Sequence, residues 1–107
     1  MKKIVLMILA LLLSTGVMAK GDPAEGEKKS ITCQACHGTD GNGTDPTYPR
    51  LAGQYADYLA HAMKSYQNGK RTNVVMVGMM SSLSEEDIED LAAFYASKTG
   101  LIDLKIK

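Results

Sequence analysis

The sequence predicts a small all-α domain. Three segments have apolar residues at helical spacing, and no segment alternates apolar and polar residues convincingly as a strand would. The chain has 107 residues, which permits one domain with a modest core. Domains of this size often need a metal, a disulfide or a cofactor for stability. We therefore expect one of these to help stabilise the helices.

The first 19 residues resemble a signal peptide. Two lysines precede an apolar run over residues 4–13, and residues 17–19 have the pattern of a cleavage site. The run is shorter than the roughly 20 residues that span a membrane, although an uncleaved anchor is the alternative. We expect cleavage after residue 19, export to the periplasm, and a mature single domain over residues 20–107. Within it, residues 101–107 are expected to form a short C-terminal tail.

The charge of the mature chain excludes one class of partner. Removal of Lys2 and Lys3 leaves ten basic and 12 acidic residues, a net charge of −2. Nucleic-acid binding favours clustered lysine and arginine, so we expect no nucleic-acid partner.

The first helix is expected over residues 22–35. Asp22 can cap it, Pro23 suits its first turn, and Glu25 and Glu27 complement the helix dipole. The stretch that follows, residues 38–49, is dense in Gly, Asp, Asn and Pro and is expected to be a loop.

Two amphipathic helices are expected in the second half of the chain. One spans residues 53–68, with Gly69 as its stop, and a loop follows over residues 70–83. The other begins after Ser84, which together with Asp87 resembles a capping box, and ends near residue 98. Two loops of twelve or more residues are uncommon in so small a domain unless they surround a ligand.

The stretch CQACHG at residues 33–38 indicates the chemistry. Two cysteines followed by a histidine can hold zinc, exchange a disulfide or carry a covalently attached haem. A zinc site wants four ligands in two pairs, and the second of the two histidines, His61, lies inside a predicted helix. A redox CxxC pair is expected beside a βαβ pattern, and the sequence has none.

Haem attachment uses all three residues at this spacing. Cys33 and Cys36 add across the haem vinyl groups, which holds His37 under the iron as a ligand. Export, length and helical content agree with this interpretation. We therefore predict one covalent haem c and its iron, held by Cys33, Cys36 and His37.

Four stretches make the chain similar to the class I c-type cytochromes. They are CQACHG, YPRLAGQYADYL, NGKRT and LSEEDIEDLAAFYAS, which together span most of residues 21–97. Within that family the chain resembles the small bacterial monohaem group and one half of the dihaem bacterial cytochromes c. The resemblance implies a small cytochrome c fold, with three to four helices wrapped around one covalently bound haem.

The resemblance also implies roles outside the motif. Pro49 resembles the proline whose carbonyl accepts a hydrogen bond from the haem-ligating imidazole and fixes the ring. Gly26 resembles the small residue at which the first helix crosses the last, against Phe94 or Tyr95. The alternative for Gly26 is an ordinary helix glycine, which is unfavourable in the middle of a helix.

A methionine is the expected sixth ligand, because a thioether favours ferrous iron and raises the reduction potential. Met76, Met79 and Met80 precede the last predicted helix, whereas Met63 lies on an apolar helix stripe and is expected in the core. Spacing alone does not separate the first three. In similar proteins that have a single methionine in this segment, the methionine stands seven residues before the apolar residue that precedes the N-cap of the last helix. That residue is Leu83, so the resemblance implies Met76.

Three other polar residues have alternative roles. His61 as a ligand would give bis-histidine ligation and a lower potential, but a histidine on a helix face is more often exposed or packed. Lys70 and Arg71 either pair with a haem propionate or form a solvated turn.

We expect a monomeric periplasmic one-electron carrier, not an enzyme, with no small-molecule substrate. Its partners would be redox proteins: a donor such as a membrane quinol-oxidising complex or a dehydrogenase, and an acceptor such as an oxidase or a reductase. One alternative is a haem subunit or domain of a larger oxidoreductase, with the tail as a docking element. The other is a haem sensor that binds a small molecule.

Overall fold

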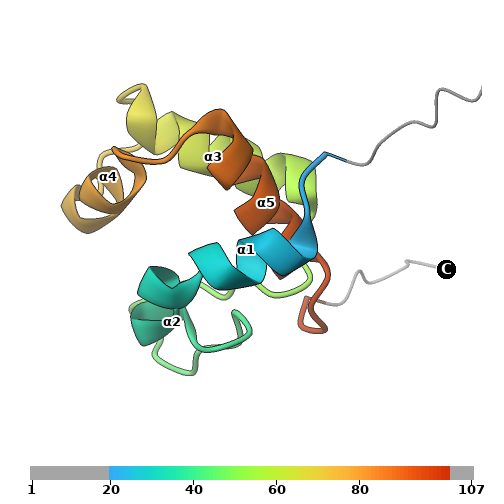
Figure 1. Ribbon diagram of the computed structural model, residues 1–107. Coiled ribbons are helices and arrows are strands. Elements are labelled where there is room, and N and C mark those ends of the chain that lie inside the picture. The colour runs from blue at the N-terminus through green and yellow to red at the C-terminus, as the bar shows by residue number, and fades with distance from the viewer. Residues whose placement is uncertain (1–19, 102–107) are drawn as a thin grey trace, which may run out of the picture.

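The computed structural model describes residues 20–101, which form five α-helices and no strand (Figure 1). The helices are α1 (Pro23–Lys29), α2 (Ile31–His37), α3 (Ala56–Gln67), α4 (Val74–Met80) and α5 (Glu85–Ala96). The predicted all-α class is confirmed, although these residues form more helices than the three to four expected. Both the predicted signal peptide and tail residues 102–107 lie outside the described residues. No helix within residues 20–101 has the length and apolar character needed to cross a membrane.

The helix caps lie where the sequence predicted them. Asp22 accepts a backbone N–H in the first turn of α1, and Pro23 occupies that turn. At α5, the Asp87 N–H donates to Ser84 Oγ at 3.1 Å and the Ser84 N–H donates to Asp87 Oδ2 at 2.9 Å, which completes the capping box. These bonds satisfy N–H groups that a helix start leaves unpaired.

The predicted helix over residues 22–35 is in fact two helices that meet at Ser30. Ser30 is completely buried, and its hydroxyl donates to the Glu27 carbonyl at 2.7 Å. A serine that binds a nearby carbonyl in this way competes with the regular helical hydrogen bonds. The chain turns there, and α2 continues to His37, two residues beyond the predicted end.

The stretch over residues 70–83, expected to be a loop, contains α4. Asn73 caps this helix by accepting the Met76 N–H at 3.1 Å. Its sequence, VVMVGMM, has three β-branched valines and a glycine, residues of low helix propensity, and no polar residue to mark an outer face. It therefore lacks the periodicity from which the other helices were predicted. One long loop, residues 38–55, remains.

α1 crosses α5 at Gly26, where the two backbones touch. A Cβ on Gly26 would lie 2.0 Å from the Asp90 carbonyl oxygen and 2.7 Å from Phe94 Cβ. No side chain fits at this distance, so the close approach requires glycine despite its low helix propensity. The predicted crossing against Phe94 is therefore confirmed, and Figure 1 shows α1 lying against α5.

The core lies around α5, which packs against α1 and against α3. α4 packs against α3. Met63 and Cys33 are partly buried against this core, so the prediction that Met63 is a packing residue is confirmed. The buried cluster consists of Leu59, Ala60, Ile88, Leu91, Ala92, Phe94 and Tyr95.

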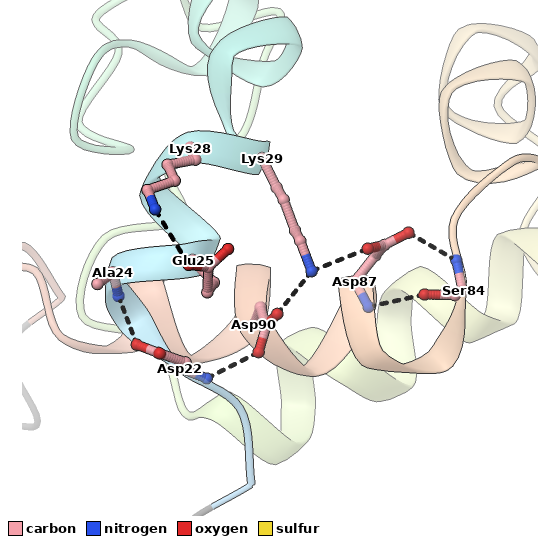
Figure 2. A network of polar contacts seen from close by, with 8 residues as sticks. All are labelled: Asp22, Ala24, Glu25, Lys28, Lys29, Ser84, Asp87 and Asp90. Atoms are coloured by element: carbon pink, nitrogen blue, oxygen red, sulfur yellow. Dashed lines mark hydrogen bonds and ion pairs between the residues drawn. The ribbon is translucent and has the colours of Figure 1, made fainter.

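Lys29 ties α1 to α5 through two carboxylates (Figure 2). Its Nζ lies 2.6 Å from Asp90 Oδ2 and 2.9 Å from Asp87 Oδ1. The other oxygen of the buried Asp90 accepts the Asp22 N–H at 2.8 Å. The hydrogen bonds from Lys29 and Asp22 lower the pKa of Asp90. The Ser84 backbone N–H and Lys29 lower the pKa of Asp87 to about 2.

These depressed pKa values predict a loss of stability in acid. Asp87 and Asp90 stabilise the fold above their unfolded pKa of 3.8, and this contribution disappears as the pH falls toward about 2. The change Asp90→Asn should lower stability at neutral pH and flatten its fall between about pH 5 and pH 2. Denaturant unfolding of the haem-loaded protein across this pH range measures both effects. Glu25→Gln, which removes an exposed ion pair with Lys28, should keep the wild-type slope. A wild-type slope in Asp90→Asn would contradict the assignment.

Candidate functional site

Helix α2 carries both cysteines of the CQACHG stretch. Cys33 and Cys36 are three residues apart, so their side chains share one face of the helix. Both are free, half-buried thiols. Burial raises the pKa of the Cys33 thiol. Two thiols on one face of a single helix can both reach one bound cofactor.

The His37 imidazole is 5% exposed and held in one orientation. Its Nδ1 lies 2.8 Å from the Pro49 carbonyl oxygen. Because a carbonyl only accepts hydrogen bonds, Nδ1 donates a proton to this contact, which leaves Nε2 as the ring nitrogen that can bind a metal. The Tyr48 ring meets the imidazole edge-on, with 6.2 Å between centroids. A metal-ligating histidine usually donates its other ring N–H to a carbonyl or a carboxylate in this way.

The loop over residues 38–55 brings Pro49 to His37. At one end, the Gly43 N–H donates to the His37 carbonyl at 2.8 Å, and a Cβ on Gly43 would lie only 2.9 Å from that carbonyl. Toward the other end, the Gly53 N–H donates to the Tyr95 carbonyl at 2.9 Å. The loop is thus fixed both to α2 and to the end of α5, and the proline between these anchors is held in place.

The three candidate methionines on α4 lie in different environments. Met80 is 3% exposed, and its carbonyl accepts a hydrogen bond from the Gln67 amide at 2.8 Å. Met79 is 37% exposed. Met76 is half-buried, so its exposure lies between those of Met80 and Met79. Helices α2 and α4 lie at the same end of the domain in Figure 1. The structure therefore places Met80 in packing and leaves Met76 and Met79 as accessible thioethers.

The other polar candidates lie on α3 and in the turn that follows it. His61 is exposed on α3, and Lys70 is exposed in the turn that follows α3. The Arg71 guanidinium lies over the Tyr58 and Tyr66 rings, 5.9 and 5.7 Å from their centroids, and donates to Tyr58 Oη at 3.2 Å. We did not predict this cluster, because no sequence motif links the two helix tyrosines to the later arginine.

A second unpredicted feature is the Tyr95 hydroxyl. It is buried and has no hydrogen-bond partner among residues 20–101. Burial raises the pKa of Tyr95, and the neighbouring Cys33 sulfur adds to the effect. An unpaired buried hydroxyl is unfavourable, and its place beside the first cysteine fits a cofactor attached there. No pattern in the sequence indicated that this hydroxyl would be unpaired.

The donor set fits haem better than zinc. Within the described part of the chain, no three His, Cys, Asp or Glu side chains gather where they could hold a metal ion. Two thiols and one oriented imidazole on α2 instead match the requirements of covalent haem attachment.

Comparison with known families decides the assignment. The profile of the family named Cytochrome c matches residues 23–98. The chain belongs to the cytochrome c family. Cytochromes c carry a covalently attached haem c with its iron, one for each domain of this kind, so the predicted cofactor is confirmed. The predicted resemblance and the small cytochrome c fold are confirmed as well.

Three relatives show how this cytochrome c compares in length. Cytochrome c4 of Pseudomonas aeruginosa is 43% identical over 92% of the chain and 49% of its own length. Cytochrome c-554(548) of Halomonas halodenitrificans is 51% identical over 73% of the chain and 98% of its own length. The crystal structure of reduced recombinant cytochrome c4 from Pseudomonas stutzeri matches with a TM-score of 0.72 and 37% identity, over 77% of the chain and 48% of that protein. The chain thus spans about half the length of its cytochrome c4 relatives.

Replacement of the cysteines tests the attachment residues. Intact mass of the mature protein should exceed the polypeptide mass by one haem, and the haem should resist acid-acetone extraction. Cys33→Ala with Cys36→Ala should release the haem into the solvent, because no thioether remains. His61→Ala, which changes an exposed residue of α3, should retain it. Retention of haem by the double cysteine variant would show that other residues hold it.

Proposed function

We propose that this cytochrome c is a periplasmic one-electron carrier whose haem iron is ligated by His37 and Met76. The observation that carries the proposal is the buried His37 ring, whose Nδ1 is occupied by the Pro49 carbonyl and whose Nε2 is available. Haem c supplies the one-electron chemistry through its iron. The periplasmic location rests on the predicted signal peptide over residues 1–19.

The residues of α2 and its loop are proposed to fix the cofactor and one ligand. Cys33 and Cys36 form the thioether links from one face of α2. His37 follows directly and needs no movement to present Nε2, because the Pro49 carbonyl already fixes the ring. The hydrogen bond from Nδ1 also raises the basicity of Nε2, which stabilises the oxidised charge state of a bound iron.

Met76 is the proposed second ligand. It lies on α4, at the same end of the domain as α2, and it is neither buried in packing like Met80 nor as exposed as Met79. A thioether ligand stabilises the reduced state and raises the potential. With His37 and Met76 both bound, no axial position would remain for a substrate, which supports a carrier and not an enzyme.

The proposed partners are redox proteins. A donor such as a membrane quinol-oxidising complex or a dehydrogenase would reduce the protein, and an oxidase or reductase would accept the electron. Transfer of this kind needs only close approach of two cofactors, so it requires neither a substrate pocket nor acid and base residues.

A domain of a larger haem protein is the second candidate. The half-length match to the cytochrome c4 relatives favours it, whereas the nearly full-length match to cytochrome c-554(548) favours a separate carrier. Sedimentation of the holoprotein isolated from its native source distinguishes the two. A single-chain mass supports the separate carrier, and a stable larger complex supports the alternative.

Substitution of the proposed methionine tests the iron ligation. Met76→Ala should abolish the weak long-wavelength sulfur-to-iron band of the ferric protein. It should also lower the reduction potential by at least about 0.1 V, because axial ligands span about 0.8 V among haem proteins. Met79→Ala and Met80→Ala should keep the band, as measured by absorption spectroscopy and a redox titration. Loss of the band in either control, with Met76→Ala unchanged, would move the ligand to that residue.

Reaction with carbon monoxide separates a carrier from a sensor or catalyst. The reduced protein should bind carbon monoxide slowly or not at all at neutral pH, because both axial positions are taken. The same protein should exchange electrons rapidly with an oxidised small cytochrome or copper protein in a stopped-flow instrument. Rapid stoichiometric binding of carbon monoxide together with sluggish exchange would support the sensor.

A further inference from the structure

Helix α4, which carries the proposed ligand Met76, depends on contacts with the rest of the chain. It has only seven residues, three of them valines and one a glycine, so it would not form a stable helix alone. It packs against α3 and lies at the edge of the domain in Figure 1. The position of Met76 therefore depends on what holds α4 against α3.

The side chain of Gln67, the last residue of α3, binds the far end of α4. Its Nε2 donates to the Met80 carbonyl at 2.8 Å and to the Leu83 carbonyl at 2.9 Å. Because both acceptors are carbonyls, the amide presents its NH2 group here and not its oxygen. One amide thus joins the end of α3 to the end of α4 and to the chain just before α5.

These two hydrogen bonds close the segment that contains α4. Residues 68–83 leave α3 and return to Gln67, so they form a loop whose two ends are joined by one side chain. Compact loops of this kind have ends that lie close together. At the start of the segment, the Arg71 N–H donates to the Ser65 carbonyl at 2.9 Å. Met76 lies in the middle of the closed loop.

The other hydrogen bonds at the ends of α4 are local. Asn73 accepts the Met76 N–H at 3.1 Å, which caps the helix but does not join it to α3. The Ser81 hydroxyl donates to the Gly78 carbonyl at 2.8 Å, again without reaching α3. Met80 is buried at 3% exposure, which adds packing to the end that Gln67 binds. Within residues 20–101, hydrogen bonding between α3 and α4 thus passes through Gln67.

We propose that Gln67 is a positioning residue for the sixth ligand, and that its two hydrogen bonds hold α4 where Met76 stays bound to the haem iron. The proposal rests on the Met76 ligation proposed above and names the residue that controls it. If Met76 leaves by movement of α4 away from α3, both bonds to Gln67 break. Because the bonds stabilise the ligated state over the released state, their removal should speed the release of Met76.

Four variants separate the loss of the donor from other changes at this place. Gln67→Leu removes the amide, and Gln67→Glu replaces it with a carboxylate that only accepts when ionised, whereas Gln67→Lys keeps N–H donors. All three replacements have helix propensities close to that of glutamine, so α3 should persist. Asn68→Asp makes the same amide-to-carboxylate change one residue later. There the side-chain oxygen accepts the Lys70 N–H at 3.1 Å, a bond that a carboxylate retains.

Displacement by imidazole in the ferric holoprotein measures how fast Met76 leaves the iron. At saturating imidazole, the sulfur-to-iron band disappears in a stopped-flow instrument at the rate of methionine release. Gln67→Leu and Gln67→Glu should release Met76 about fivefold faster, the factor that one net hydrogen bond is worth. Gln67→Lys and Asn68→Asp should stay near the wild-type rate. Amide hydrogen exchange of residues 77–80 should rise in the first two variants only, and denaturant unfolding verifies that each variant is folded.

Two results would overturn the role of Gln67. One is a wild-type release rate in both Gln67→Leu and Gln67→Glu. The other is an equal increase in Asn68→Asp or Gln67→Lys, which would show that the lost donor is not the cause. Either result leaves the Met76 ligation intact. If Met76→Ala keeps the sulfur-to-iron band, the proposed ligation itself is wrong, and the role of Gln67 is wrong with it.

Discussion

Contact between the backbones of α1 and α5 at Gly26 sets the position of α2, the helix that carries the proposed haem-attachment residues. Because α2 follows α1 after the single residue Ser30, the crossing determines where the CQACHG stretch lies. Lys29, at the end of α1, fastens the same crossing through Asp87 and Asp90. The loop that carries Pro49 is fixed to the other end of α5 through the Gly53 hydrogen bond to the Tyr95 carbonyl. Contacts with α5 thus fix the positions of both the His37 imidazole and the Pro49 carbonyl that orients it.

Features that depend on local chemistry were predictable from the sequence. Asp22 and Ser84 cap helices because their side chains bond to N–H groups two or three residues away, and such bonds need no tertiary information. The CQACHG motif is likewise local, since covalent attachment depends on the spacing within one helical turn. The hydrogen bond between His37 and Pro49 spans twelve residues and was expected only from the resemblance to known cytochromes c.

Features that depend on tertiary contacts were missed. Ser30 breaks the first predicted helix because it is completely buried and bonds to Glu27, and burial is not visible in the local pattern. α4 was missed because VVMVGMM has neither helical periodicity nor good helix propensity, so its helix depends on the Asn73 cap and on packing against α3. The Arg71 cluster with two tyrosines also arises only when distant residues are folded together.

Proton NMR of the reduced holoprotein is the most direct test of the central claim, that His37 and Met76 hold one covalent haem in this fold. The ring current of low-spin haem displaces the methyl resonance of an axial methionine far upfield. We expect one such methyl, assigned to Met76 by its loss in a Met76 variant, with the methyls of Met63, Met79 and Met80 at ordinary positions. The absence of any displaced methionine methyl, or its assignment to another methionine, would rule out ligation by Met76.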